Sequence, residues 1–193
     1  MRYTEYKGAA EKHMKTCLGI VEAMSKLKVS DSSALLVSRN KQATIHNLFY
    51  LSGYVLESIS TYAVYKHFGW NPNHSVRVYN AAFVQRSNFS FKMNHSGAGN
   101  SYYLEYHDFQ SNQFEVLKTQ LNNSGIPIID SSVIVDTEMQ ILFNLWKPEI
   151  RYHEPNKSYP FFFNNQVSLD ESKILNFVAL TNNIYNTIIQ AVG

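Results

Sequence analysis

The sequence predicts an all-α protein: an up-and-down bundle of four or five helices with an irregular insertion at about residues 69–100. Three observations predict this fold. Apolar residues recur at three- and four-residue steps in several long segments, which is typical of amphipathic helices. Hydrophobic residues make up 45% of the chain, enough for a buried core. A length of 193 residues without internal repeats suits a single domain, 1–193.

The two N-terminal helices carry the clearest pattern. The first is predicted from about Glu5 to Leu27 and the second from about Gln42 to Phe68. Ser52 and Gly53 lie inside the second helix, although glycine costs about 1 kcal/mol in a helix interior. These small residues predict a close approach of a neighbouring helix. Gly69, followed by a Trp-Asn-Pro sequence, predicts a clean stop.

The insertion and the C-terminal half are less regular. In residues 69–100 a weak alternation predicts a short hairpin that ends in a Gly- and Ser-rich loop. Further helices are predicted at about Ser101–Asn122 and Asp136–Trp146. The last helix is predicted to begin with a capping box, in which Ser168 and Glu171 satisfy free backbone donors.

Composition excludes several classes of protein. The net charge is +2 and the pI about 8.5, too mild to indicate nucleic-acid binding by itself. One cysteine, Cys17, excludes an internal disulfide and a zinc site of several thiolates. The seven His are scattered and no phosphate loop occurs, so we expect neither a metal site nor a cofactor. Without an 18-residue apolar run or a signal region, we expect a cytoplasmic protein with no membrane contact.

Three sequence pieces resemble a known family. The first is His46–Glu57, which reads His-Asn-Leu-Phe-Tyr-Leu-Ser-Gly-Tyr-Val-Leu-Glu. The second is His107-Asp108-Phe109, and the third is Trp146–Tyr152, which reads Trp-Lys-Pro-Glu-Ile-Arg-Tyr. In order and spacing they are similar to the second helix, the His-Asp-Leu helix start and the Trp-x-x-Glu-Leu-Arg-Tyr turn of HEPN domains. The insertion at 69–100 is longer than the resemblance leads us to expect.

The resemblance implies a helical bundle that commonly pairs into dimers. Some HEPN proteins are metal-independent RNases, some are toxins, and some bind nucleotides or partner proteins. A homodimer formed by bundle helices is also expected from the 14% aromatic content, which makes an exposed apolar patch hard to avoid. A nucleotidyltransferase partner is expected if the chain belongs to a toxin–antitoxin or defence pair.

Arg39 and His46 are the candidate catalytic residues. Active HEPN domains carry an Arg, usually with a polar residue after it, then a His after a spacer of four to six residues, and Arg39-Asn40 meets this pattern at its longest spacing. His can move protons near neutral pH and Arg can hold phosphate oxygens. Seven residues separate the two by about 10 Å along a helix, so a two-fold dimer would have to combine two copies. The alternative is a core-edge His46 with Arg39 in a preceding loop.

Two further pairs come from the resemblance. Arg151 and Tyr152 would tie a turn to the bundle, and binding of a ligand there is the alternative. His107 and Asp108 are interpreted first as a helix start, with Asp as the cap, and second as a site.

The insertion offers basic residues interleaved with aromatic ones. Arg77, Arg86 and Lys92 could hold phosphates, and the interleaved aromatics could stack bases; these are Tyr79, Phe83, Phe89 and Phe91. The alternative is a partly buried flap whose charges face water, since three basic residues are too few for strong non-specific binding. The sequence thus predicts a partner- or nucleic-acid-linked binding module that can contact RNA, with an endoribonuclease and a structural scaffold as alternatives.

Overall fold

The computed structural model describes residues 1–26, 34–87, 89, 91–96, 99–104, 137–146, 150 and 169–193. The described helices are α1 (Thr4–Lys26), α2 (Ala34–His67), α3 (Ala81–Ser87), α5 (Thr137–Leu145) and α7 (Glu171–Val192). Two strands, β1 (Phe91–Ser96) and β2 (Gly99–Leu104), form an antiparallel hairpin. The all-α prediction is confirmed.

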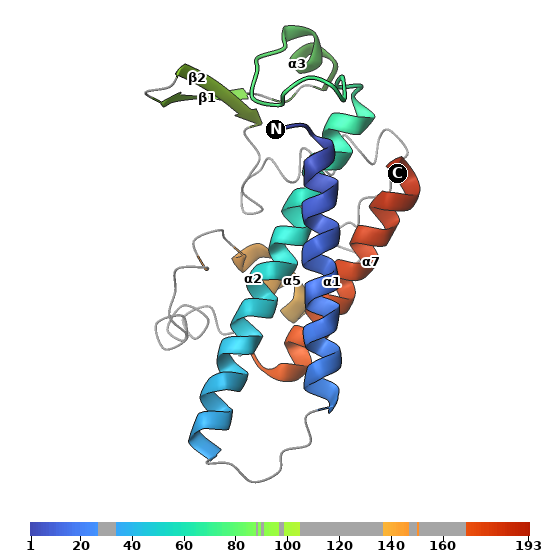
Figure 1. Ribbon diagram of the computed structural model, residues 1–193. Helices are drawn as coiled ribbons and strands as arrows, with labels where there is room; N and C mark the ends of the chain where they lie inside the picture. The colour runs from blue at the N-terminus through green and yellow to red at the C-terminus, as the bar shows by residue number, and fades with distance from the viewer. Residues whose placement is uncertain are drawn as a thin grey trace.

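Three long helices make the body of the molecule. α1 runs antiparallel to α2, and α7 packs on α2 and on α1, while α5 packs on α7 (Figure 1). Along α1, α2 and α7 the predicted stripes are buried; their fully enclosed members include Cys17, Leu48, Phe49, Ile59, Phe177 and Ile188. No helix in the described part of the chain is long and apolar enough to cross a membrane.

The small residues of α2 mark two close contacts. Ser52 is fully buried, and its hydroxyl lies 3.8 Å from the Cys17 sulfur on α1. Burial raises the pKa of the Cys17 thiol to about 11, so this cysteine is an inert core residue rather than a nucleophile. The helix–helix approach predicted at this position is therefore confirmed on the side of Ser52.

Gly53 makes a different contact. A Cβ atom at this position would overlap the indole ring of Trp146, the residue after α5. The same indole donates a hydrogen bond from Nε1 to the Tyr50 carbonyl oxygen, 3.1 Å away and one turn earlier in α2. Glycine at position 53 leaves room for the flat indole ring of Trp146, which packs residues 137–146 against the bundle. The close contact at Gly53 is therefore with this ring and not with the backbone of a second helix.

Helix boundaries correct the sequence analysis in two places. α2 begins at Ala34, eight residues before the predicted start, because no Gly or Pro lies between residues 34 and 52 to interrupt it. The predicted capping box is wrong, since Asp170 is the N-cap of α7 and its carboxylate accepts from the Lys173 N–H at 2.9 Å. Asp170 competes successfully because it is an equally good N-cap residue two positions later.

The segment after α2 confirms a hairpin in the insertion, but at a later position. The hairpin pairs Phe91 with Leu104 and Met93 with Tyr102, so the strands extend into the Gly-rich stretch from both sides, as far as Ser96 and Gly99. The helix predicted from Ser101 is wrong over residues 101–104, which form β2; its remainder lies outside the described residues. Tyr102 and Tyr103 favour a strand by their aromatic character, and cross-strand pairing outweighs the helical spacing.

Candidate nucleic-acid interface

The C-terminus of α2 turns the chain away from the bundle. Gly69 has a φ of 70°, the Trp70 N–H donates to the Tyr65 carbonyl at 2.8 Å, and the Gly69 N–H donates to the Lys66 carbonyl at 3.2 Å. These bonds, with Trp70 and Tyr65 rings 5.1 Å apart, form a Schellman motif with its hydrophobic contact. The predicted stop at Gly69 is confirmed, and it places everything up to residue 104 at one end of the bundle (Figure 1).

An aromatic cluster fills this end. Phe83 of α3 is fully buried, with its ring centroid 5.3 Å from Tyr65, 4.9 Å from Trp70 and 6.1 Å from Phe91. The Asn80 side chain caps α3 by accepting from the Phe83 N–H at 3.0 Å, so the cap and the buried ring belong to the same turn. α3 therefore closes the end of the bundle and supports the hairpin.

The hairpin is joined to the turn around Arg77. The Tyr102 N–H donates to the Arg77 carbonyl at 3.0 Å, and the Val76 N–H donates to the Met1 carbonyl at 3.0 Å. Tyr79, which follows this turn, lies with its ring 5.6 Å from Tyr102 and 6.0 Å from Phe91. The N-terminus, the turn and β2 thus lie side by side, as Figure 1 shows.

Charge is distributed unevenly along the chain. Residues 58–104, which we call the acid-free segment, contain no Asp or Glu and four basic residues, Lys66, Arg77, Arg86 and Lys92. Since the whole chain has a net charge of +2, the segment carries +4 and the remaining residues carry −2. All 15 carboxylate side chains lie outside the segment, so a polyanion meets no acidic side chain within it.

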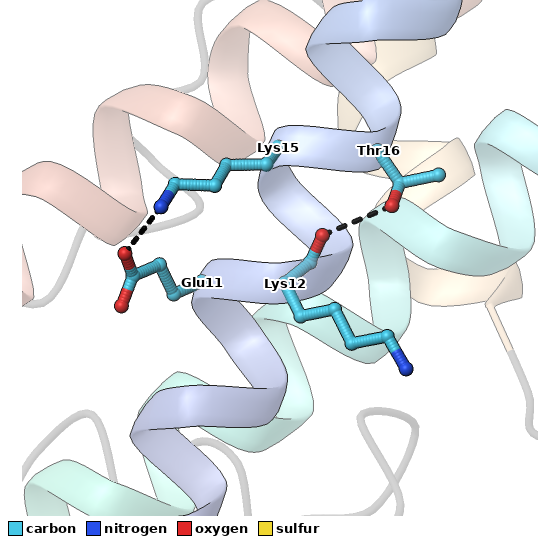
Figure 2. Close-up of polar contacts among 4 residues, drawn as sticks. All are labelled: Glu11, Lys12, Lys15 and Thr16. Atoms are coloured by element: carbon cyan, nitrogen blue, oxygen red, sulfur yellow. Dashed lines mark hydrogen bonds and ion pairs between the residues drawn. The ribbon is translucent and has the colours of Figure 1, made fainter.

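The surface of α1 is arranged differently. Lys15 pairs with Glu11 at 2.7 Å, and Thr16 donates to the Lys12 carbonyl oxygen at 3.0 Å (Figure 2). Lys26 pairs with Glu22 in the same i, i+4 geometry. Each of these two lysines is neutralised by its own helix, which leaves little net field for a partner.

The boundary between α1 and the acid-free segment contains a partly buried phenol, that of Tyr6. Burial, followed by the charge of Glu57, raises the pKa of Tyr6 to about 12, whereas the charge of Arg77 acts in the opposite direction. The charge of Arg77 acts on Tyr6, and the Arg77 side chain is also exposed to solvent. Arg77 therefore lies close enough to α1 for its charge to act on Tyr6.

The predicted insertion residues fall into different environments. Arg86 donates from its Nε and from a terminal nitrogen to the carbonyls of Phe68 and Gly69, at 3.1 and 3.4 Å, which places its charge at the C-terminus of α2. Phe89 is 5% exposed and packs on Phe68 with centroids 6.2 Å apart, so its ring lies in the core and not on a surface open to bases. Lys92 is on β1, and its side chain lies outside the described part.

The candidate catalytic pair lies on one continuous helix. Arg39 belongs to α2 and not to a preceding loop, and the same helix carries His46 seven residues later. His46 is only 7% exposed, and its Nδ1 atom is buried. The Arg39 side chain lies outside the described residues. The burial of His46 favours the core-edge alternative for this residue.

The remaining predicted site residues, His107, Asp108, Arg151 and Tyr152, lie outside the described residues. Within the described residues, no group of three or more His, Cys, Asp or Glu side chains is arranged to hold a metal ion. The pair at Gly53 and Trp146 nevertheless joins two of the three pieces that resemble HEPN domains, since one residue comes from each piece. A scan against protein-family models and searches of curated proteins and solved structures found no match.

Sequence reasoning named Tyr79 among several aromatic residues but did not identify which side chains are most open at this end. Tyr79 is 54% exposed, Val78 48% and Met93 43%, while Tyr102 is half-buried beside them. The absence of acidic residues from 58–104 would have marked the segment in the sequence. Which aromatic ring faces solvent could not be read in advance, because it depends on the hairpin register and on the position of α3.

Proposed function

We propose that this chain is a HEPN-like helical module that binds nucleic acid through its acid-free segment. The observation that carries the proposal is the separation of charge, with +4 in residues 58–104 and −2 in the rest of the chain. The phosphate backbone supplies most of the affinity in nucleic-acid binding, and it is drawn to surfaces with excess basic charge. The exposed aromatic side chains in the same segment provide contacts for bases.

The small number of basic side chains limits the expected affinity for nucleic acid. Arg86 is already engaged with carbonyls at the end of α2, so at most three basic side chains of the segment, Lys66, Arg77 and Lys92, are available to phosphates. The logarithm of the binding constant for a single strand falls with the logarithm of salt concentration by about 0.7 per phosphate contact, so we expect a slope of roughly −2. Binding is expected at micromolar rather than nanomolar concentration in physiological salt.

A charge-reversal pair tests the proposal. Arg77→Glu places a carboxylate in the acid-free segment, whereas Lys12→Glu makes a charge change of the same size on the exposed surface of α1. We expect Arg77→Glu to weaken binding of a fluorescent RNA 20-mer at least about tenfold, because it removes one attraction and adds one repulsion. Lys12→Glu should change affinity less than about threefold. Equal effects of the two substitutions would contradict binding at this segment.

The biological setting follows from the HEPN resemblance. We place the module in a cytoplasmic toxin–antitoxin or defence-type system, as a homodimer with a nucleotidyltransferase as partner protein. The contact of Gly53 with Trp146 supports the HEPN-like assignment, because it makes the two resembling pieces one structural unit. Light scattering tests the homodimer: about 44 kDa is expected, and the 22.2 kDa monomer at micromolar concentration would contradict it.

A second candidate is a metal-independent endoribonuclease that uses Arg39 and His46 across a dimer. It is favoured by the position of Arg39 on α2, which gives the pair the helical spacing expected of the motif. The burial of His46 opposes it, because RNA would reach that ring only after a rearrangement. RNA cleavage that persists in EDTA and falls at least about a hundredfold in His46→Ala would establish this activity; full activity in His46→Ala would exclude the residue.

A further inference from the structure

The hairpin has one apolar face that is only partly covered. In an antiparallel pair, alternate residues share a face, and the register sets Phe91 and Met93 on the same side as Tyr102, the cross-strand partner of Met93. Near the bundle this face is covered, since the Phe91 ring lies 6.1 Å from Trp70 and 6.1 Å from Phe83. Farther along the ribbon the cover ends, and Met93 is 43% exposed.

Tyr79 continues this open face onto the neighbouring turn. Its ring lies 5.6 Å from Tyr102 with an angle of 48° between the planes, and it is 54% exposed. The Tyr102 N–H, which points away from β1, is bonded to the Arg77 carbonyl, so the backbone of Arg77 borders the same surface. Tyr79, Met93 and Tyr102 therefore form an aromatic platform with the Arg77 backbone at its edge.

We infer that this platform of Tyr79, Met93 and Tyr102 stacks the unpaired bases of single-stranded nucleic acid; the inference rests on the proposed function. Charge indicates the occupant, because the platform lies in a segment that carries +4 with no carboxylate. An apolar face that served a second copy of this chain would bring two such positive segments together, at an electrostatic cost. A polyanion with flat apolar groups suits both the charge and the rings.

The low number of cations argues for unpaired bases over a duplex. Base–aromatic stacking contributes affinity at each base, but it requires an exposed base face that a duplex does not offer. With at most three phosphate contacts from this segment, duplex binding would depend on weak electrostatics alone. The platform therefore selects single strands, and it does not require a 2′-hydroxyl, so DNA and RNA single strands should bind similarly.

Removal of the ring tests the inference. Tyr79→Leu keeps an apolar side chain of similar exposure but cannot stack, and we expect it to weaken binding of a uridine 12-mer at least about tenfold. Tyr79→Phe keeps the ring and should stay within about twofold of the wild type. Circular dichroism and thermal melting of both variants check that the fold is retained, as expected for a side chain that is mostly exposed.

The nucleic acid is varied in the same assay. A 12-mer backbone without bases should bind at least about tenfold more weakly than the uridine 12-mer, as should a 12-base-pair duplex. If the strand without bases binds as well as the complete one and Tyr79→Leu has no effect, stacking is overturned, while a loss in Arg77→Glu would leave the proposed function standing. If polyglutamate displaces the RNA at equal charge concentration, the surface binds polyanions without base recognition and the inference also fails. If no strand binds even at low salt, the proposed function itself fails.

Discussion

Two lysines of α1, Lys15 and Lys26, lie beside carboxylates of their own helix, whereas the basic residues of the acid-free segment have no carboxylate within that segment. Lys15 and Glu11 are 2.7 Å apart on an exposed surface, and Lys173 of α7 reaches Glu138 of α5 at 2.8 Å. Pairs of this kind contribute little to stability, but they neutralise the surface. The difference teaches that the net charge of +2 is a poor guide to this molecule, because it averages a positive end and a negative body.

The two regions also differ in how their aromatic side chains are packed. In the body, the indole ring of Trp146 covers Gly53 and donates its N–H to the Tyr50 carbonyl oxygen. The ring lies so close to Gly53 that there is no room for a Cβ atom at this position. At the acid-free segment, rings contact one another in a chain from Tyr65 through Phe83 and Phe91 to Tyr79, and the last of them is open to solvent. The first arrangement serves stability and the second leaves a surface for a partner.

The largest expected effect separates these two kinds of ring. Trp146→Ala should lower the free energy of unfolding by about 3–5 kcal/mol, because it empties a buried site and leaves the space over Gly53 unfilled. Tyr79→Ala should cost less than about 1 kcal/mol, since its ring is 54% exposed. Urea denaturation of both variants measures the difference, and similar losses would remove the distinction between a structural ring and a surface ring.

Substitution of two glycines in the helical body, Gly53 and Gly19, should change the free energy of unfolding in opposite directions. Gly53→Ala should destabilise the protein by about 1–3 kcal/mol because its Cβ overlaps Trp146, and Gly53→Leu should cost at least as much. Gly19→Ala on α1 meets no atom within 4 Å and should stabilise it by up to about 1 kcal/mol through helix propensity alone. A stabilising Gly53→Ala would contradict the described position of the indole.

Arg86 sharpens the comparison within the acid-free segment. Its guanidinium donates to the carbonyls at the end of α2, so Arg86→Ala should lower the free energy of unfolding by about 0.3–1 kcal/mol. The same substitution should weaken RNA binding less than Arg77→Glu does. If Arg86→Ala abolishes binding without changing the melting temperature, Arg86 is a phosphate contact and not a helix cap.

A further expected effect is in the alkaline range. Because the folded pKa of Tyr6 is raised to about 12 from an ordinary value of 10, its contribution to stability is complete below pH 10 and is lost as the pH rises through 12. Wild-type protein should therefore lose stability between pH 10 and 12, and Tyr6→Phe should lose less over the same interval. Urea denaturation at several pH values checks this, and parallel curves for the two proteins would show that Tyr6 ionises as readily in the folded state.

Helical periodicity was enough to predict the body but not its ends. The stripes of α1, α2, α5 and α7 and the stop at Gly69 could be read directly, because burial of one helix face leaves a pattern in the sequence. The start of α2 and the choice of Asp170 over Ser168 could not, since several residues near a helix end can satisfy the same backbone groups. Residues 101–104 belong to a six-residue strand, Gly99–Leu104, which is too short to show a clear period against a helical background.

The residue types of the candidate site could be predicted from the sequence, but the surface that they form could not. Basic and aromatic residues in the insertion could be recognised, but Phe89 lies in the core and Arg86 caps α2, whereas Tyr79 and Tyr102 supply the open rings. The register of β1 against β2 decides which side chains share the apolar face, and the turn at Arg77 decides how far that face extends. Neither is encoded in spacing along one segment.

The central claim is that nucleic acid contacts the acid-free segment and not the ion-paired body. Ultraviolet crosslinking of the full chain to a single-stranded RNA that contains 4-thiouridine, followed by mass spectrometry of the crosslinked peptides, tests it most directly. We predict crosslinks within residues 69–104, with Tyr79 or Tyr102 among the modified residues, and their loss when unlabelled single strand competes. Crosslinks concentrated on α1 or α7 would contradict the account.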